Sequence, residues 1–291
     1  MKFFYYILLL IVFVSCANTD KKEENQIVSV KLSSIDSLKL LKFWKTADKN
    51  KWTKRNISEI QIAVAEWFLG TPYVGGTLEI NEEEQLVINL QELDCVTFVE
   101  NITALSMCVK SAAFSNEEYF KKLQTIRYRD GKINGYVSRL HYFTDWLLNN
   151  QNKGLINIVS NEIGDADFDA SVSFMSDNPQ YYKALSDSIA LAEIKKTEKQ
   201  ISTANLKMVS EENLEKLENL IKDGDIIAIA TTIKGIDIAH TGIAIHHKGR
   251  LHFIHASSVK GKVVISEKPL SEYLKRIKTD IGVLIARIKQ Y

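Results

Sequence analysis

The chain has 291 residues, 45% of them hydrophobic and 25% charged, an ordinary globular composition that excludes disordered, collagen-like and multi-span membrane proteins. Its 37 basic and 36 acidic residues leave a formal charge of +1, too weak a field for a nucleic-acid-binding protein. Three cysteines cannot all pair within one chain, so at least one of them has a role other than a disulfide.

Residues 1–15 predict a signal peptide that ends at a lipidated cysteine. Lys2 precedes an apolar run from Phe3 to Val14, which is short for a membrane span and has the length of a signal-peptide core. Cys16 follows directly, in the order Phe-Val-Ser-Cys, which resembles the bacterial lipoprotein signal. An ordinary signal peptide cleaved nearby is the alternative.

The lipoprotein interpretation has consequences for the location of the protein. Residues 16–31 are polar and charge-rich over most of their length and predict a solvated tether between the anchor and the folded body. We therefore expect an envelope protein held to a membrane by lipid on Cys16. The residue directly after Cys16 is not Asp, which favours the outer membrane, with the protein facing the periplasm.

Residues 32–222 have mostly helical patterns, and strand patterns follow from Asp225 onward, so the predicted fold class is α+β. Ser58 and Gln61 have the spacing of a capping box, and Gly70 stands where that helix would stop. Helices are expected within 32–56 and at 58–69, 95–110, 115 onward, 138–150, 185–200 and 210–222. Strands are expected at 225–232, 239–247, 250–257, 262–266 and 281–288.

Cys95 stands at the predicted start of the helix 95–110. Asp94 is a good N-cap residue, which would place Cys95 at the first helical position. The unpaired N–H groups and the positive dipole end there favour a thiolate, the nucleophile of acyl transfer. Cys108 is 13 residues further along, ~20 Å in a continuous helix, too far for a disulfide. We interpret Cys108 as a small buried hydrophobic residue.

Five of the six histidines lie within His240–His255 and supply candidates for a catalytic base. Lys248-Gly249 predicts a two-residue hairpin turn in which His247 opposes Arg250. In that register His240 and His255 share one face as diagonal neighbours. The small residues Gly242 and Ala244 on this face would leave room for the start of the Cys95 helix. We infer a triad of Cys95 as nucleophile, His240 as general base and acid, and His255 as its orienting group.

The remaining histidines allow a second interpretation. His247, His252 and His255 offer nitrogen ligands for zinc, although the register places His255 on the opposite face from the other two. We therefore favour a site without a metal or other cofactor. His246, His247 and His252 are interpreted as solvent-side residues near the turn, and His141 as structural or adjacent to the substrate.

Several segments together resemble the NlpC-type cysteine peptidases, papain-like enzymes that cut bacterial cell-wall peptides. The matching segments, in order, are Gly70-Thr71-Pro72-Tyr73-Val74-Gly75-Gly76, Asp94-Cys95, Asp225-Ile226-Ile227, His240-Thr241-Gly242-Ile243-Ala244-Ile245 and Ile254-His255-Ala256-Ser257. The resemblance implies a papain-like α+β fold with Cys95, His240 and His255 as the triad. It places Tyr73 at the substrate-facing wall near the backbone N–H of Cys95, and it makes Ser257 a substrate-binding candidate. It also implies one catalytic domain, residues 32–291, with helical additions at about 111–224.

Two departures from the usual family pattern point to one branch of the superfamily. The helix opens Asp94-Cys95-Val96-Thr97 where the family has Asp-Cys-Ser-Gly, and Tyr73-Val74-Gly75-Gly76 lacks the usual tryptophan. In the common endopeptidase branch, polar groups near those positions help to hold the free amine of L-alanine in a stem peptide. The long insertion with Tyr136–Trp146 is similar to the N-acetylmuramoyl-L-alanine amidase-like branch, whose substrate nitrogen is acylated. Arg139 and Tyr142 are candidates for contacts to a substrate carboxylate or sugar.

The resemblance therefore implies a monomeric cell-wall hydrolase that cleaves the amide between the lactyl group of muramic acid and L-alanine through a Cys95 thioester. Its substrates would be peptidoglycan or muropeptide fragments. A γ-D-glutamyl–diamino acid endopeptidase with the same triad is the alternative enzyme. A lipoprotein that only binds wall fragments is the alternative from another class.

Overall fold

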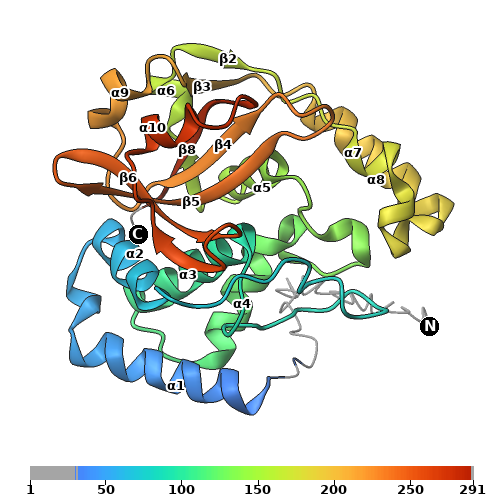
Figure 1. Ribbon diagram of the computed structural model, residues 1–291. Coiled ribbons are helices and arrows are strands. Elements are labelled where there is room, and N and C mark those ends of the chain that lie inside the picture. Colours follow the sequence, from blue (N-terminus) through green and yellow to red (C-terminus); the bar gives the residue numbers. More distant parts are fainter. Residues whose placement is uncertain (1–29, 31, 290–291) are drawn as a thin grey trace, which may run out of the picture.

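The computed structural model describes residue 30 and residues 32–289 (Figure 1). The expected signal peptide 1–15, the lipidation site Cys16 and nearly all of the expected tether 16–31 lie outside the described residues. Within the described part, no helix has both the length and the apolar character needed to cross a bilayer.

Helices make up most of the first two thirds of the described chain and strands most of the last third (Figure 1). The helices are α1 (Ser34–Lys49), α2 (Ile57–Trp67), α3 (Cys95–Lys110), α4 (Asn116–Arg127), α5 (Phe143–Asn152), α6 (Ser160–Ile163), α7 (Phe174–Asp177), α8 (Ser188–Ile201), α9 (Leu214–Leu217) and α10 (Leu270–Leu274). The strands are β1 (Ile156–Ile158), β2 (Ala166–Phe168), β3 (Leu206–Ser210), β4 (Ile226–Thr231), β5 (Ile238–His247), β6 (Arg250–Ser257), β7 (Lys262–Ile265) and β8 (Asp280–Ile288).

The strands form one antiparallel sheet in the order β2-β3-β8-β4-β5-β6-β7, with β1 also paired to β8. The C-terminal strands 226–288 form most of it, so the predicted α+β class with a C-terminal antiparallel sheet is confirmed. The three short strands β1 to β3 lie in the segment 111–224, which the sequence pattern assigned to helices.

The sheet is covered on both faces, and β4 shows how the sequence achieves this. Ile226 and Ala228 face the main core, which they share with α2, α3, α4 and α5, whereas Ile227 and Ile229 face a second core under α9 and α10. Successive strand residues point to opposite faces, so a strand covered on both sides needs a continuous apolar run. All six residues of β4 are buried. In Figure 1 the sheet lies between α2, α3 and α4 on one side and α6, α9 and α10 on the other.

The helix α3 is the centre of the main core. It begins and ends where the sequence pattern predicts, and its residues from Thr97 to Val109 are all buried, Cys108 among them. A helix that is buried on all sides is fixed in place by its neighbours. The first residue of α3, Cys95, is therefore held rigidly against the sheet.

Other helix boundaries differ from the sequence prediction. The predicted capping box of Ser58 and Gln61 is wrong, since Asn56 caps α2 and forms the box with Glu59. The helix expected at 138–150 begins only at Phe143, and the one expected at 210–222 is the short α9 after β3. In the first case the Asn-x-x-Glu pair supplies a better acceptor for the free N–H groups two residues earlier.

Candidate active site

Asp94 fixes the start of α3 and with it the position of Cys95. The Asp94 carboxylate accepts a hydrogen bond from the backbone N–H of Thr97 at 2.7 Å. In return the Thr97 hydroxyl oxygen accepts one from the backbone N–H of Asp94 at 2.9 Å. This closed capping box makes Cys95 the first helical residue, whose own N–H has no acceptor within the helix.

The hairpin of β5 and β6 has the predicted register. His247 pairs with Arg250 and Ile243 with Ile254, and the turn residues Lys248 and Gly249 both have positive φ. Nε2 of His240 lies 2.7 Å from Nδ1 of His255, and the two rings meet edge to face at 4.9 Å. The predicted contact between the two imidazoles is therefore present.

Aromatic rings hold His255 in its orientation. The Phe253 ring stacks on the His255 ring at 4.1 Å, and Tyr273 of α10 meets it edge-on at 5.7 Å. Gly242 leaves the space for this packing, because a Cβ there would lie 2.7 Å from both the Ile254 carbonyl oxygen and Cδ2 of Phe253. The small residue is thus required by the hairpin itself.

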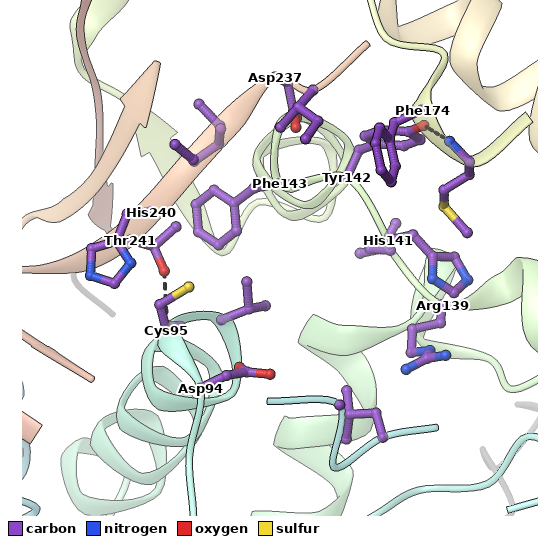
Figure 2. A pocket seen from close by; sticks show the side chains of 18 of the residues that line it. Asp94, Cys95, Arg139, His141, Tyr142, Phe143, Phe174, Asp237, His240 and Thr241 are labelled. Carbon is purple, nitrogen blue, oxygen red and sulfur yellow. Dashed lines mark hydrogen bonds between the residues drawn. The ribbon is translucent and has the colours of Figure 1, made fainter. Parts of the chain in front are cut away.

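The sequence prediction that α3 packs on the Gly242 and Ala244 face is wrong. The neighbouring residue Thr241 meets the start of α3, and its hydroxyl donates a 2.8 Å hydrogen bond to the backbone carbonyl of Cys95 (Figure 2). His240 still reaches the cavity because the pairing of β4 with β5 shifts register beside it, between Ile229 and Ala230. Such an irregularity redirects side chains at the end of a strand.

Cys95 and His240 line one cavity of about 370 Å³, with the Cys95 sulfur pointing into it (Figure 2). Its walls come from the start of α3, the loop before it, the segment 139–143, α7 and the start of β5. The lining includes five of the site residues predicted from the sequence, namely Asp94, Cys95, Arg139, Tyr142 and His240. His255 stands behind His240, outside the lining residues.

The cavity keeps the reactive groups neutral at rest. Burial, and after it the nearby Asp94 carboxylate, raise the pKa of the Cys95 thiol to about 11. Burial lowers the pKa of His240 to about 4, and burial followed by repulsion from His240 lowers that of His255 to about 3. Desolvation and the Asp94 carboxylate therefore disfavour the resting thiolate that the helix start was expected to favour. The site holds a thiol beside a neutral imidazole.

Arg139 reaches the cavity already paired with two carboxylates. Its guanidinium lies 2.5 Å from Glu79 and 3.4 Å from Glu84, over the ring of Tyr136, and only 6% of the side chain is exposed. A substrate carboxylate at Arg139 would have to share or displace Glu79, the more exposed of the two partners. Its assignment as a substrate contact stays a prediction.

Tyr142 uses its hydroxyl within the protein. The hydroxyl donates to Glu198 of α8 at 2.7 Å and accepts from the backbone N–H of Met175 at 2.9 Å, so it ties α7 and α8 to the cavity wall. Only the ring remains for a substrate. The role predicted for Tyr142 likewise stays a prediction.

Tyr73 and Ser257 lie outside the residues that line this cavity. Tyr73 is half-buried close enough to Cys95 and Asp94 that their charges add to the burial that raises its pKa. The Ser257 hydroxyl accepts from the backbone N–H of Lys260 in the turn after β6. Neither predicted role is tested by these contacts.

Three cavity residues were missed or only partly foreseen. Besides Thr241, Asp237 accepts a 2.7 Å bond from the backbone N–H of Thr144 and so holds the start of α5 against the cavity. His141 bonds the Tyr136 carbonyl through Nε2, which makes Nε2 the protonated nitrogen and leaves Nδ1 as an acceptor. Burial, then repulsion from Arg139, lower the pKa of His141 to about 3, so it stays neutral. Of the sequence features of His141, only its position directly after Arg139 could have indicated that it lines the cavity.

The histidines of the zinc alternative do not share one contact: His255 meets His240, on the other side of the hairpin register. His247 and His252 meet edge to face at 5.5 Å, and Nδ1 of His252 bonds the Ser266 carbonyl at 2.8 Å. His252 is buried, so its assignment as a solvent-side residue is wrong. Among residues 30 and 32–289, no three His, Cys, Asp or Glu side chains are grouped as metal ligands.

The chain is similar to known proteins over most of its length. Residues 63–283 match the family model AmiA-like, described as N-acetylmuramoyl-L-alanine amidase-like. An N-acetylmuramoyl-L-alanine amidase from Bacteroides uniformis is 39% identical, with a TM-score of 0.77 over 80% of this chain and 99% of the other. These matches define an amidase-like hydrolase of peptidoglycan. The chain belongs to the AmiA-like, N-acetylmuramoyl-L-alanine amidase-like family.

Two further structures show how far the likeness extends. A Bacteroides fragilis protein, provisionally named a xylanase, is 41% identical, with a TM-score of 0.74 over 78% of this chain and 100% of the other. A Legionella pneumophila protein of the family model DUF1460 is 21% identical over 87% of this chain and 94% of its own, with a TM-score of 0.65, and shares the fold. Among curated proteins no sequence matches the chain.

Proposed function

We propose that the protein is a cysteine-dependent N-acetylmuramoyl-L-alanine amidase with Cys95, His240 and His255 as its catalytic triad, within the NlpC-type papain-like superfamily. The observation that carries the proposal is the 2.7 Å contact of the two imidazoles behind a cavity that Cys95 and His240 share. A nucleophile, a base and a group that orients the base are the parts that covalent acyl transfer needs.

The proposed reaction begins with proton transfer, since the thiol is neutral at rest. As the Cys95 sulfur attacks the lactyl carbonyl, the thiol proton passes to Nδ1 of His240. Nε2 of His240 keeps its proton and donates it in a hydrogen bond to Nδ1 of His255, which fixes the tautomer that the base needs. His255 thus acts by orienting and polarising His240.

The tetrahedral intermediate then collapses to a thioester. The free backbone N–H of Cys95, next to Tyr73, is the donor that we assign to the oxyanion. The protonated His240 gives its proton to the departing L-alanine nitrogen, and the C–N bond breaks. Water, deprotonated by His240, hydrolyses the thioester, which releases the lactyl carboxylate and restores the thiol.

We further propose that lipid on Cys16 anchors the enzyme in the cell envelope, at the outer membrane facing the periplasm, where it acts as a monomer on wall polymer or its fragments. The anchor would hold the enzyme beside its substrate. Labelling with a radioactive fatty acid tests this, because Cys16→Ala is expected to abolish incorporation and incorporation in that variant would contradict it.

Digestion of one defined muropeptide tests the proposed bond. An amidase releases the muramic-acid sugar and the intact stem peptide, whereas a γ-D-glutamyl–diamino acid endopeptidase leaves the sugar on a shortened peptide. Mass spectrometry separates the two sets of products. A shortened peptide still attached to its sugar would overturn the assignment of the amidase bond.

A further inference from the structure

The outward side of α1 has the composition of a helix that lies on a membrane. Three large apolar residues there are exposed, Ile35 at 54%, Leu38 at 66% and Leu41 at 50%. Lys42, Lys45 and Lys49 lie beside them. We call these six residues the outer face of α1. No other helix in the described part of the chain has more than one exposed large apolar residue.

The buried side of α1 shows that this exposure is not caused by loose packing. Phe43 packs on Trp67 at 5.2 Å, and Trp44 stacks on Phe114 at 5.7 Å. Asp36 accepts the backbone N–H of Leu90 at 2.9 Å. The helix is therefore fixed to the body by one face while its opposite face, apolar and basic, has no cover within the described residues.

The three lysines of the outer face have no ion-pair partner among the described residues. Lys39 turns inward and donates to the Leu90 carbonyl at 2.9 Å. By contrast, none of the ion pairs between described residues includes Lys42, Lys45 or Lys49. A shallow depression between these lysines, Leu38 and Leu41 completes the face. Exposed leucines flanked by unpaired lysines fit an anionic lipid surface.

The position of this face along the chain agrees with that occupant. Cys16 is 14 residues before Val30, the first described residue, and α1 begins four residues after Val30. Even fully extended, 14 residues span only about 50 Å, so a lipid on Cys16 would keep α1 near the bilayer. In Figure 1, α1 lies along the lower edge of the molecule, on the far side of α2 and α4 from the sheet.

We propose that the outer face of α1 docks on the anionic phospholipid surface of the membrane that carries the anchor, with the leucines at the acyl boundary and the lysines at the headgroups. The helix provides a second, reversible contact with the membrane beside the lipid on Cys16. Because Asp36 and Lys39 both bind Leu90, five residues before Cys95, docking also orients the cavity relative to the membrane. No residue of α1 lines that cavity, so docking and catalysis are separable.

Vesicle flotation of the mature chain, residues 16–291 with Cys16→Ser so that no lipid is attached, tests the proposal. We expect the chain to bind vesicles of phosphatidylglycerol and phosphatidylcholine at low salt, and to lose most binding at about 1 M salt, where the Debye length falls to roughly 3 Å. It should not bind phosphatidylcholine alone. Loss of Lys2 with the signal peptide makes the net charge of the mature chain 36 − 36 = 0, so net charge does not drive the binding.

Two sets of substitutions on α1 separate charge from apolar contact. Lys42→Gln, Lys45→Gln and Lys49→Gln together should lower the partition coefficient about 100-fold, at roughly fivefold for each lysine near the surface. Leu38→Gln with Leu41→Gln should lower it at least about tenfold, through lost apolar burial. Both variants should hydrolyse a soluble muropeptide as the parent chain does.

The helix α8 supplies the matched control. It also exposes an apolar residue, Ile189 at 74%, and it carries Lys195, Lys196 and Lys199 on its surface. Replacing these four by Gln makes the same charge change and should leave the partition coefficient within about threefold. Equal losses in the α1 and α8 variants would overturn the proposal, as would no binding of the parent chain to anionic vesicles. A dimer in solution that Leu38→Gln and Leu41→Gln dissociate would also overturn it, since a second copy would then cover the face.

Discussion

Nε2 of His240 lies 2.7 Å from Nδ1 of His255, so one proton joins the two imidazoles and leaves only Nδ1 of His240 for a substrate or a thiol. Both rings are neutral near pH 7, since burial lowers their pKa values to about 4 and about 3. In the proposed mechanism this contact sets the orientation and the tautomer of His240, the base.

Removing each histidine should have a different effect. General acid–base catalysis contributes typically 10²–10⁴-fold, so we expect His240→Ala to lower kcat/KM about 10³-fold. His255→Ala should cost less, because His240 keeps its proton-transfer role and loses only its orienting partner. His255→Asn should recover part of the loss, since the amide oxygen can accept from Nε2. The control is His247→Ala, which removes an exposed imidazole at the other end of β5. A larger loss in His255→Ala than in His240→Ala would show that the two roles are reversed.

The neutral thiol predicts an unusual pH dependence of alkylation. Only the thiolate reacts, and burial with Asp94 raises the pKa of Cys95 to about 11. The raised pKa keeps the thiol protonated until the pH approaches that value. The rate of reaction with iodoacetamide should therefore rise about tenfold per pH unit from pH 7 to about pH 10, with no plateau.

Peptide mapping after alkylation separates the two described cysteines. Cys108 is fully buried and should remain unmodified in the folded chain, which makes it the internal control. A plateau in the rate of Cys95 near neutral pH would show a thiolate paired with imidazolium and would contradict the neutral resting state.

Thr241 should act as a positioning residue. Thr241→Val keeps the shape of the side chain but removes the 2.8 Å bond to the Cys95 carbonyl. We expect the free energy of unfolding to fall by about 1 kcal/mol. We expect kcat to fall roughly 10-fold to 100-fold with little change in KM, because the nucleophile is displaced while the cavity remains. The control is Thr203→Val, which removes a similar hydroxyl-to-carbonyl bond after α8 and should leave kcat unchanged. An unchanged kcat in Thr241→Val would contradict the positioning role of Thr241.

Gly242 should be required for stability. An alanine Cβ would lie 2.7 Å from the Ile254 carbonyl oxygen and from Phe253, neither of which can move freely in the hairpin. Gly242→Ala should lower the free energy of unfolding by about 1–3 kcal/mol, measured by denaturant titration. At Gly75 the nearest atom to such a Cβ is 3.8 Å away and φ is not positive, so Gly75→Ala should be nearly neutral. Equal stability of the two variants would show that the hairpin adjusts.

The sequence predicts those parts of the site that depend on local chemistry. Asp94 before an apolar helix predicts the start of α3, and Lys248-Gly249 predicts the register that brings His240 to His255. It does not predict features that depend on distant contacts. The strands β1 to β3 are only three to five residues long and exist because β8 and β3 pair with them.

Within the cavity, too, the sequence does not predict features that depend on distant contacts. The register shift beside His240 lets its side chain reach the cavity, and alternation of residue types carries no sign of it. Asp237 and Thr144 are 93 residues apart in sequence, so their bond could not be anticipated. The raised pKa of Cys95 is also a property of the folded surroundings, since burial and the Asp94 carboxylate cause it.

The most direct test of the central proposal is mass spectrometry of the protein after it is quenched in acid during turnover of a defined muropeptide and then digested. We predict a covalent adduct on the peptide that contains Cys95. The adduct should have the mass of the muramic-acid sugar and its lactyl acyl group, without any amino acid. The adduct should be absent in Cys95→Ala. An adduct that contains L-alanine and D-glutamate would show cleavage further along the stem peptide, and full turnover by Cys95→Ala would contradict Cys95 as the nucleophile.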